Sequence, residues 1–382
     1  MIKQADTLLQ AAKDFSANRV RPLAAFFDQG NGIPRELITD MGRSGLLGAP
    51  LPTRYGGGGA DARLWGEITR EIGKACCSVR SVLTVHSALI GETIVRLGND
   101  EQKNRLLPDI CSGKQIGAFA LSEPDTGSDA RGIKTAYAKT GEGYTINGVK
   151  KWITLGDLAD FFIVIAQDQG RISAFFVERE RTGITSVPLN GIIGNRGSHI
   201  AEVTLRDVYV PQSNLFCGEG MGFSHVVNTA MDFGRSSIAW AGLAIAEEAL
   251  ECMTSYALQR KQFGALIGTL GGVRTMIADA AVAVHAGRRL CEHAAHSRTE
   301  RSVDLIHDTI TAKYFTSRAA VQITNNAVQL YGANGCSSQF LPERLLREAK
   351  ILEVIEGTSQ VLQEVIADYA LTKYSPLKKN TV

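Results

Sequence analysis

Three stretches of different hydrophobic periodicity follow one another along the 382 residues, and their order limits the fold more than any other feature. Up to about residue 117, apolar side chains recur at helical spacing. From 118 to about 211 the chain has short β-type runs, such as 161–165, separated by Gly, Asp and Asn turns. From 222 to about 371 long helical periodicity returns. The sequence therefore predicts an α+β protein with helices at both ends and strands in the middle.

The length favours a division into several domains, because 382 residues exceed the usual size of one simple domain. The order of helices, strands and helices sets the expected boundaries. We predict an N-terminal α-helical domain over residues 1–117, a middle β-barrel domain over residues 118–215 and a C-terminal four-helix bundle domain over residues 216–382.

Charge and composition exclude several classes of partner. Lys and Arg together number 41, Asp and Glu number 39, and no long basic run is present, which argues against nucleic acid as the main partner. No apolar stretch approaches membrane-spanning length, and residues 1–6 lead into a helical pattern without a signal-peptide core. The seven Cys residues show neither metal-ligand spacing nor a disulfide framework. We expect a cytoplasmic protein with no membrane span, no metal site and reduced thiols.

A carboxylate is expected at a break between two helices near the C-terminus. Apolar residues recur at helical spacing from 345 to Ile355, Gly357 is a natural stop signal, and the pattern resumes at Ser359. Glu356 lies at this break, where a carboxylate can act as a general base and the next helix start offers free backbone N–H groups to an anion. The alternative is a solvated helix terminus.

Five segments carry recognisable motifs. They are residues 120–129 (Ala-Leu-Ser-Glu-Pro-Asp-Thr-Gly-Ser-Asp), 147–154 (Asn-Gly-Val-Lys-Lys-Trp-Ile-Thr), 260–264 (Arg-Lys-Gln-Phe-Gly), 329–335 (Gln-Leu-Tyr-Gly-Ala-Asn-Gly) and 355–360 (Ile-Glu-Gly-Thr-Ser-Gln). Through these segments, taken in this order, the chain resembles the acyl-CoA dehydrogenase family over nearly its whole length. The resemblance implies the acyl-CoA dehydrogenase fold and FAD as the cofactor.

The resemblance assigns flavin contacts to residues of the middle and C-terminal domains. Ser122, Gly127 and Ser128 place small residues in a turn, where backbone and hydroxyl groups can approach a flavin and its diphosphate. We expect Trp152 and Thr154 on alternate positions of one strand, facing the same way toward the flavin ring. The alternative is a barrel-core Trp152 and a surface Thr154. The FAD-binding residues implied are Leu121, Ser122, Gly127, Ser128, Trp152, Ile153, Thr154, Arg260, Gln262, Phe263, Gln329, Leu330, Gly332, Gly335, Thr358 and Gln360.

Some of these contacts imply an oligomer. By resemblance, Arg260, Gln262 and Phe263 reach the FAD of a neighbouring subunit, so we expect a homodimer or a homotetramer. An Arg offers charge-assisted donors to phosphate. The alternative for Arg260 is a solvated helix end.

The resemblance also implies the reaction. Glu356 is the catalytic residue and removes the α-proton of an acyl thioester, while N5 of the flavin takes the β-hydride. The thioester carbonyl needs hydrogen-bond donors that stabilise the enolate-like transition state. In the family these donors are a ribityl hydroxyl and the backbone N–H of the catalytic Glu.

Arg80 is the main indication of the substrate. It lies in an otherwise apolar helical stretch, with Thr84 and Ser87 expected on the same face. A cation there needs an anionic partner, and an internal salt bridge is one reading. By resemblance, glutaryl-CoA dehydrogenase holds a distal carboxylate with a similar Arg-Ser pair. The substrate-binding residues implied are Arg80, Ser81, Thr84, Arg235 and Gly357.

A further resemblance points to a carrier protein. The stretch around Arg80 is similar to that of the acyl-carrier-protein-linked dehydrogenases of methoxymalonyl and aminomalonyl extender-unit pathways. We therefore predict an FAD-dependent dehydrogenase of a short polar acyl group on an acyl carrier protein. The alternatives are a short-chain or dicarboxylic acyl-CoA dehydrogenase and a non-catalytic scaffold homologue. The electron acceptor is expected to be an electron-transfer flavoprotein or oxygen.

Overall fold

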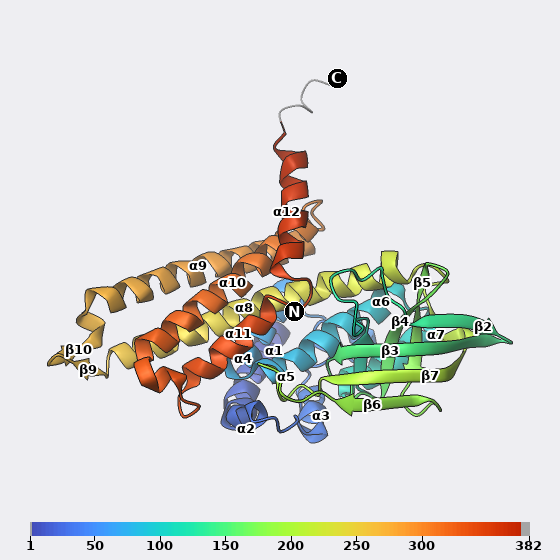
Figure 1. Cartoon of the computed structure of the whole chain (residues 1–382), viewed down its shortest axis with the longest axis horizontal. Helices are drawn as coiled ribbons and strands as arrows, with labels where there is room; N and C mark the ends of the chain where they lie inside the picture. Colours follow the sequence, from blue (N-terminus) through green and yellow to red (C-terminus); the bar gives the residue numbers. More distant parts are fainter. Residues whose placement is uncertain (1, 376–382) are drawn as a thin grey trace. The chain divides into compact units, whose positions relative to one another are not determined.

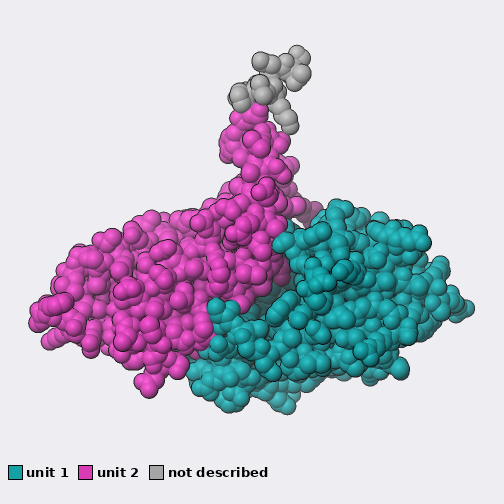
Figure 2. Space-filling view, viewed as in Figure 1, with its two compact units in different colours: residues 1–237 teal, residues 238–382 magenta. Residues whose placement is uncertain are grey.

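The computed structural model describes residues 2–375, and side chains from residue 6 onward. It divides into two compact units, residues 1–237 and 238–382 (Figure 2). Residue 1 and residues 376–382, at the ends of the predicted first and last domains, lie outside the described part.

Helices occupy the first part of unit 1. They are α1 (Ile2–Phe15), α2 (Ala24–Asp28), α3 (Arg35–Arg43), α4 (Ala62–Ala75), α5 (Cys77–Val82), α6 (Glu92–Leu97) and α7 (Asp100–Ser112) (Figure 1). A π-helical segment, Leu83–Gly91, continues α5. Asp61 caps α4 by accepting from the Leu64 amide, and Asn99 and Gln102 form a capping box at α7.

One eight-stranded sheet forms the second part of unit 1. Its strands are β1 (Gly117–Ala120), β2 (Ala136–Thr140), β3 (Gly143–Ile153), β4 (Phe161–Asp168), β5 (Arg171–Glu178), β6 (Ile184–Pro188), β7 (Ala201–Pro211) and β8 (Leu215–Phe216). The order is β6-β7-β3-β2-β4-β5-β8, and β1 pairs in parallel with β4. The predicted strand-rich middle of the chain is thus built on this sheet.

β4 is buried on both faces, which explains its continuous apolar sequence. Because side chains alternate along a strand, the two faces of β4 contribute side chains to two different hydrophobic clusters. Even-numbered residues of β4 join the cluster that also holds Tyr137, Tyr144 and Phe175. Odd-numbered residues join the cluster that holds Phe119 and Phe176. The sheet therefore has a core on each side.

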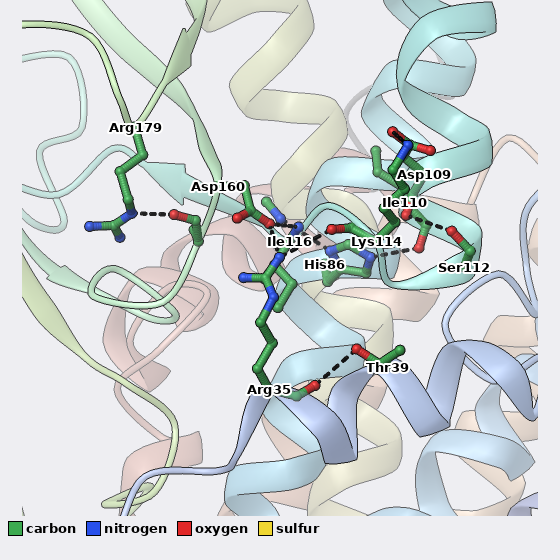
Figure 3. A network of polar contacts seen from close by, with 12 residues as sticks. Arg35, Thr39, His86, Asp109, Ile110, Ser112, Lys114, Ile116, Asp160 and Arg179 are labelled. Atoms are coloured by element: carbon green, nitrogen blue, oxygen red, sulfur yellow. Dashed lines mark hydrogen bonds and ion pairs between the residues drawn. The ribbon is translucent and has the colours of Figure 1, made fainter.

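A buried imidazole ties the helices of unit 1 to the sheet (Figure 3). His86, in the π-helical segment, donates from Nε2 to the Ile110 carbonyl on α7 at 2.9 Å and accepts the Gly117 amide of β1 on Nδ1 at 3.2 Å. An amide can only donate, so Nδ1 must carry no proton and the ring is neutral. Burial lowers the pKa of His86 to about 4.

Unit 2 is helical. It contains most of α8 (Asn228–Ala257), the hairpin strands β9 (Lys261–Gln262) and β10 (Ala265–Leu266), and the helices α9 (Gly271–Thr299), α10 (Leu305–Tyr331), α11 (Leu341–Leu352) and α12 (Ser359–Lys373). Gly242 of α8 allows a close helix crossing, because a Cβ there would lie 2.7 Å from the Thr316 backbone of α10. Figure 1 shows α12 extending away from the other helices of this unit.

The predicted α+β class, with helices, then a sheet, then helices, is confirmed. The boundaries at residues 117 and 215 stay a prediction. Within residues 2–375, no helix combines the length and apolar character that crossing a bilayer requires.

Candidate active site

Trp152 lies at a β-bulge on β3. The pairing of β3 with β7 changes register between Lys150 and Ile153, and Trp152 has a positive φ of 65°. Bulges change the direction of side chains, and here Trp152 is 54% exposed while the neighbouring Ile153 is buried. Trp152 is therefore not a core residue, which removes the packing alternative.

The expected strand geometry of Thr154 was wrong. β3 ends at Ile153, so Thr154 lies in the following turn, where it is half-buried. The register change and the left-handed backbone at Trp152 interrupt the alternation on which the expectation relied.

The loop after β1 lies beside the bulge. The Lys151 amide donates to the Ser122 carbonyl at 2.8 Å, and the Lys150 ammonium donates to the Leu121 carbonyl at 2.9 Å. Two motifs that are far apart in the sequence therefore meet next to Trp152.

The turn at Gly127 and Ser128 is exposed, and a Cβ at Gly127 would meet nothing within 4 Å. An exposed indole, a Ser-bearing loop and an open glycine turn on one chain segment fit a planar aromatic cofactor with a polar chain. These residues of unit 1 are consistent with a flavin site.

Glu356 lies in unit 2, in the turn between α11 and α12, as predicted. α11 ends at Leu352, three residues before the end of the apolar pattern. The Ser359 amide donates to the Glu353 carbonyl at 2.9 Å and closes the turn. Glu356 and Gly357 have φ values of 55° and 94°. A left-handed non-glycine residue costs about 1 kcal/mol or more, and such residues cluster at active sites.

Two contacts hold the Glu356 turn. Fully buried Lys313 of α10 donates from Nζ to the Gly357 carbonyl at 2.7 Å. Thr358 caps α12, because its hydroxyl accepts the Val361 amide. Gln360 is exposed on the first turn of α12. Lys313 was not recognised from the sequence, where a Lys inside a helix gives no signal of burial.

The other predicted C-terminal residues form two neighbouring groups in unit 2. Gln329, Leu330, Gly332 and Gly335 lie at the end of α10 and in the turn that follows. Arg260, Gln262 and Phe263 are exposed in and beside the β9–β10 hairpin. The groups meet through the end of α8, because Tyr331 donates to the Cys252 carbonyl and Asn334 donates to the Tyr256 hydroxyl.

Phe263 is the most exposed of these residues. The residue is 94% exposed and its φ is 51°. A large aromatic side chain held in this way by a hairpin is available to a partner outside its own chain.

Arg80 is fully buried on α5, and its described partners are neutral. Its Nη1 donates to Thr84 Oγ1 at 2.6 Å, and its Nη2 donates to Ser81 Oγ at 3.0 Å and contacts Cys77 Sγ at 3.5 Å. Thr84 Oγ1 shares a further hydrogen bond of 2.7 Å with Ser237 Oγ of α8.

Among the described residues no carboxylate pairs with Arg80, and its Nε has no hydrogen-bond partner. The internal salt bridge is therefore wrong. Ser87 was also misplaced, because it donates to the Leu47 carbonyl instead of joining this network. The π-helical turn that begins at Leu83 shifts the periodicity on which that expectation relied.

Arg235 lies two turns inside α8 and is half-buried. Sequence reasoning missed Ser237, although it lies two residues from Arg235. It also missed the buried ion pair between Lys150 and Glu123, which are 27 residues apart. The only indication of this ion pair in the sequence was the position of Lys150, two residues before Trp152 in β3.

Three parts of the chain match the three domains of one family. Residues 3–114 match the acyl-CoA dehydrogenase N-terminal domain, residues 118–208 the middle domain and residues 220–371 the C-terminal domain. The chain belongs to the acyl-CoA dehydrogenase family. Members of this family are FAD-dependent oxidoreductases that act on CH–CH groups, so the predicted enzyme class and cofactor are confirmed.

Curated relatives align along almost the whole acyl-CoA dehydrogenase chain. An acyl-CoA dehydrogenase of Bacillus subtilis is 38% identical over 364 residues, which cover 94% of this chain and 96% of the relative. A short-chain specific acyl-CoA dehydrogenase of Clostridium acetobutylicum is 34% identical over 372 residues, with coverage of 96% and 98%.

Solved structures include both CoA-linked and biosynthetic relatives. Butyryl-CoA dehydrogenase from Megasphaera elsdenii has a TM-score of 0.92 at 32% identity, covering 96% of this chain and 98% of its own. Glutaryl-CoA dehydrogenase from Mycobacterium smegmatis has a TM-score of 0.92 at 28% identity, covering 96% and 94%. FkbI, described as serving biosynthesis of the methoxymalonyl extender unit of a polyketide, has a TM-score of 0.87 at 29% identity, covering 95% and 99%.

Proposed function

We propose that this acyl-CoA dehydrogenase oxidises a short polar acyl group carried by an acyl carrier protein, in extender-unit biosynthesis for polyketides or nonribosomal peptides. The single observation that carries the polar substrate is Arg80, a fully buried guanidinium whose described partners are neutral. The likeness to FkbI supports the extender-unit context.

The free-energy cost of burying Arg80 supports a polar substrate. Taking a guanidinium out of water costs several kcal/mol, and hydroxyl groups alone offset little of that cost. An anionic or strongly polar end of the acyl group would complete the pairing. Thr84, Ser81 and Ser237 would add hydroxyl groups around that end. A plain fatty chain would leave the charge uncompensated.

Glu356 is the proposed catalytic base. The helix break keeps its carboxylate off a solvated helix face, and Lys313 and the Thr358 cap fix the turn that carries it. Its carboxylate would take the α-proton of the thioester, and its own backbone N–H would support the thioester carbonyl. Bound FAD supplies the acceptor for the β-hydride.

The residues proposed to hold FAD are those that the family resemblance implies. In unit 1 they are the loop at Leu121, Ser122, Gly127 and Ser128, with Trp152, Ile153 and Thr154. In unit 2 they are Thr358, Gln360, and the groups around Gln329 and Arg260. The exposed Phe263 supports a role toward a second subunit, and hence a homodimer or homotetramer. We further propose a cytoplasmic location and an electron-transfer flavoprotein or oxygen as the acceptor.

A second candidate is a short-chain or dicarboxylic acyl-CoA dehydrogenase. The 34% identity to a short-chain specific enzyme and the likeness to glutaryl-CoA dehydrogenase favour it, and Arg80 would serve a dicarboxylic acyl group equally well. The third candidate, a non-catalytic scaffold, is disfavoured because Glu356, Trp152 and Arg260 are all present.

The test is anaerobic bleaching of the bound flavin by one small hydroxyacyl or dicarboxylic acyl group, presented on an acyl carrier protein and on CoA. We expect faster bleaching with the carrier-linked form. Faster bleaching with the CoA form would refute the carrier-protein substrate and favour a short-chain or dicarboxylic acyl-CoA dehydrogenase. Purified protein without a yellow flavin would point to the scaffold.

A further inference from the structure

We propose that the buried ion pair of Lys150 and Glu123 is a positioning device for FAD, which sets the loop between β1 and β2 against the Trp152 bulge. The inference rests on the proposed function, because it assumes that FAD binds at this loop. On this proposal neither Lys150 nor Glu123 contacts the reacting atoms.

Lys150 links the pair to the flavin loop. Its side chain is fully buried, and its Nζ donates to Glu123 Oε1 at 2.7 Å and to the Leu121 carbonyl at 2.9 Å. The backbone of the next residue, Lys151, donates to the Ser122 carbonyl. The strand that bears Trp152 thus fixes two consecutive carbonyls of the loop. A displacement of Lys150 would move Leu121 and Ser122 relative to the indole.

Glu123 holds the far end of the same loop. Its carboxylate, 5% exposed, accepts the Lys134 amide at 2.6 Å on Oε2 and the Thr135 amide at 2.9 Å on Oε1. Its backbone exchanges hydrogen bonds with Thr126. Residues 123 to 135 are therefore closed into one loop by a single side chain, and the open turn at Gly127 lies inside it.

The charges around the pair favour the ionised state of Glu123. Burial alone would raise the pKa of this carboxyl, but the hydrogen bonds from Lys150, Thr135 and Lys134 outweigh it and lower the pKa. The carboxylate then accepts three donors at fixed directions. Three hydrogen bonds with fixed directions restrict the conformation of the loop more than apolar packing does.

Stability alone does not explain such a pair. Two ions lose their hydration on burial, and an uncharged pair of similar volume is often as stable or more stable. A role in geometry does explain it, because an apolar side chain at position 150 could not donate to the Leu121 carbonyl. We therefore expect fold stability and FAD binding to separate when both charges are removed.

The test compares Lys150→Met with the double variant Glu123→Gln/Lys150→Met. The single variant leaves a buried carboxylate without its cation, so its apoprotein melting temperature should fall. The double variant removes that penalty, although the Gln carbonyl oxygen can accept only one of the two amides that Glu123 binds. Its melting temperature should recover in part, while the Kd for FAD should stay at least about tenfold weaker. The absorption spectrum and midpoint potential of the flavin that does bind should also shift.

Lys139→Met is the matched control, because it removes an exposed Lys from the adjacent strand β2. This variant should change neither the melting temperature of the apoprotein nor the Kd for FAD. A double variant that binds FAD with the original Kd and spectrum would overturn the inference. A double variant whose apoprotein does not fold would also overturn it, since the pair would then be a stability element. Absence of FAD binding by the unmodified protein would instead refute the proposed function.

Discussion

The neutral His86 predicts a specific loss of stability in acid. In the folded protein its pKa is about 4, whereas an unfolded His titrates near 6.5. The unfolded state therefore takes up a proton as the pH falls below 6.5, and the folded state does not until the pH approaches 4. Stability from this group is present above pH 6.5 and is lost as the pH falls through that window.

The magnitude follows from the shift. One pKa unit corresponds to about 1.4 kcal/mol, so the full loss is about 3 kcal/mol below pH 4 and about 2 kcal/mol at pH 5. The structural reason is that a protonated Nδ1 cannot accept the Gly117 amide. Asp160, which accepts from Arg35 and the Ile116 amide nearby (Figure 3), opposes the shift only weakly.

The assay is urea unfolding at several pH values between 7 and 4, comparing the unmodified protein with His86→Gln. A Gln amide can donate to Ile110 and accept from Gly117 but does not titrate. The free energy of unfolding should fall by about 3 kcal/mol less in the variant over this range. His225→Gln, which replaces an exposed His of unit 1, is the control. Equal acid losses in the unmodified protein and in His86→Gln would refute the reasoning.

Three further predictions concern the site and one neighbouring loop. Glu356→Gln should retain FAD but lose flavin reduction by substrate in stopped-flow absorbance, and unchanged reduction would remove Glu356 as the base. Arg80→Met should lower kcat/KM for a polar or anionic acyl thioester by about 10- to 100-fold more than for the butyryl thioester, and equal losses would return Arg80 to a structural role. Burial alone would lower the pKa of His199, but Asp157 and the Ile33 carbonyl outweigh it and raise the pKa, so its stabilisation should be present below pH 6.5 and lost as the pH rises through the raised value. Thermal melting of His199→Gln against the unmodified protein from pH 6 to 9 checks this, and a constant difference between the two would contradict it.

The sequence could predict the elements whose signals are local. The helix break at Glu356 follows from the apolar spacing before it and from Gly357 and Thr358 after it. The helix–strand–helix order likewise follows from periodicity alone.

Other features depend on partners far along the chain. The bulge at Trp152 arises from the pairing of β3 with β7, about 50 residues later in the chain. The sequence of β3 alone does not predict it. The sequence around Arg80 was equally compatible with an internal salt bridge and with a contact to the substrate. Only the packing of α5 among neutral neighbours decided against the salt bridge.

Backbone strain gives an independent argument for three of the predicted site residues. Trp152, Phe263 and Glu356 all have positive φ, a conformation that glycine adopts without penalty. Each position carries a large side chain instead, at a cost of about 1 kcal/mol or more. Packing does not offset that cost at Trp152 or Phe263, because both rings are mostly exposed. For Trp152 and Phe263, a bound flavin and a second subunit are the two partners that the proposed function supplies.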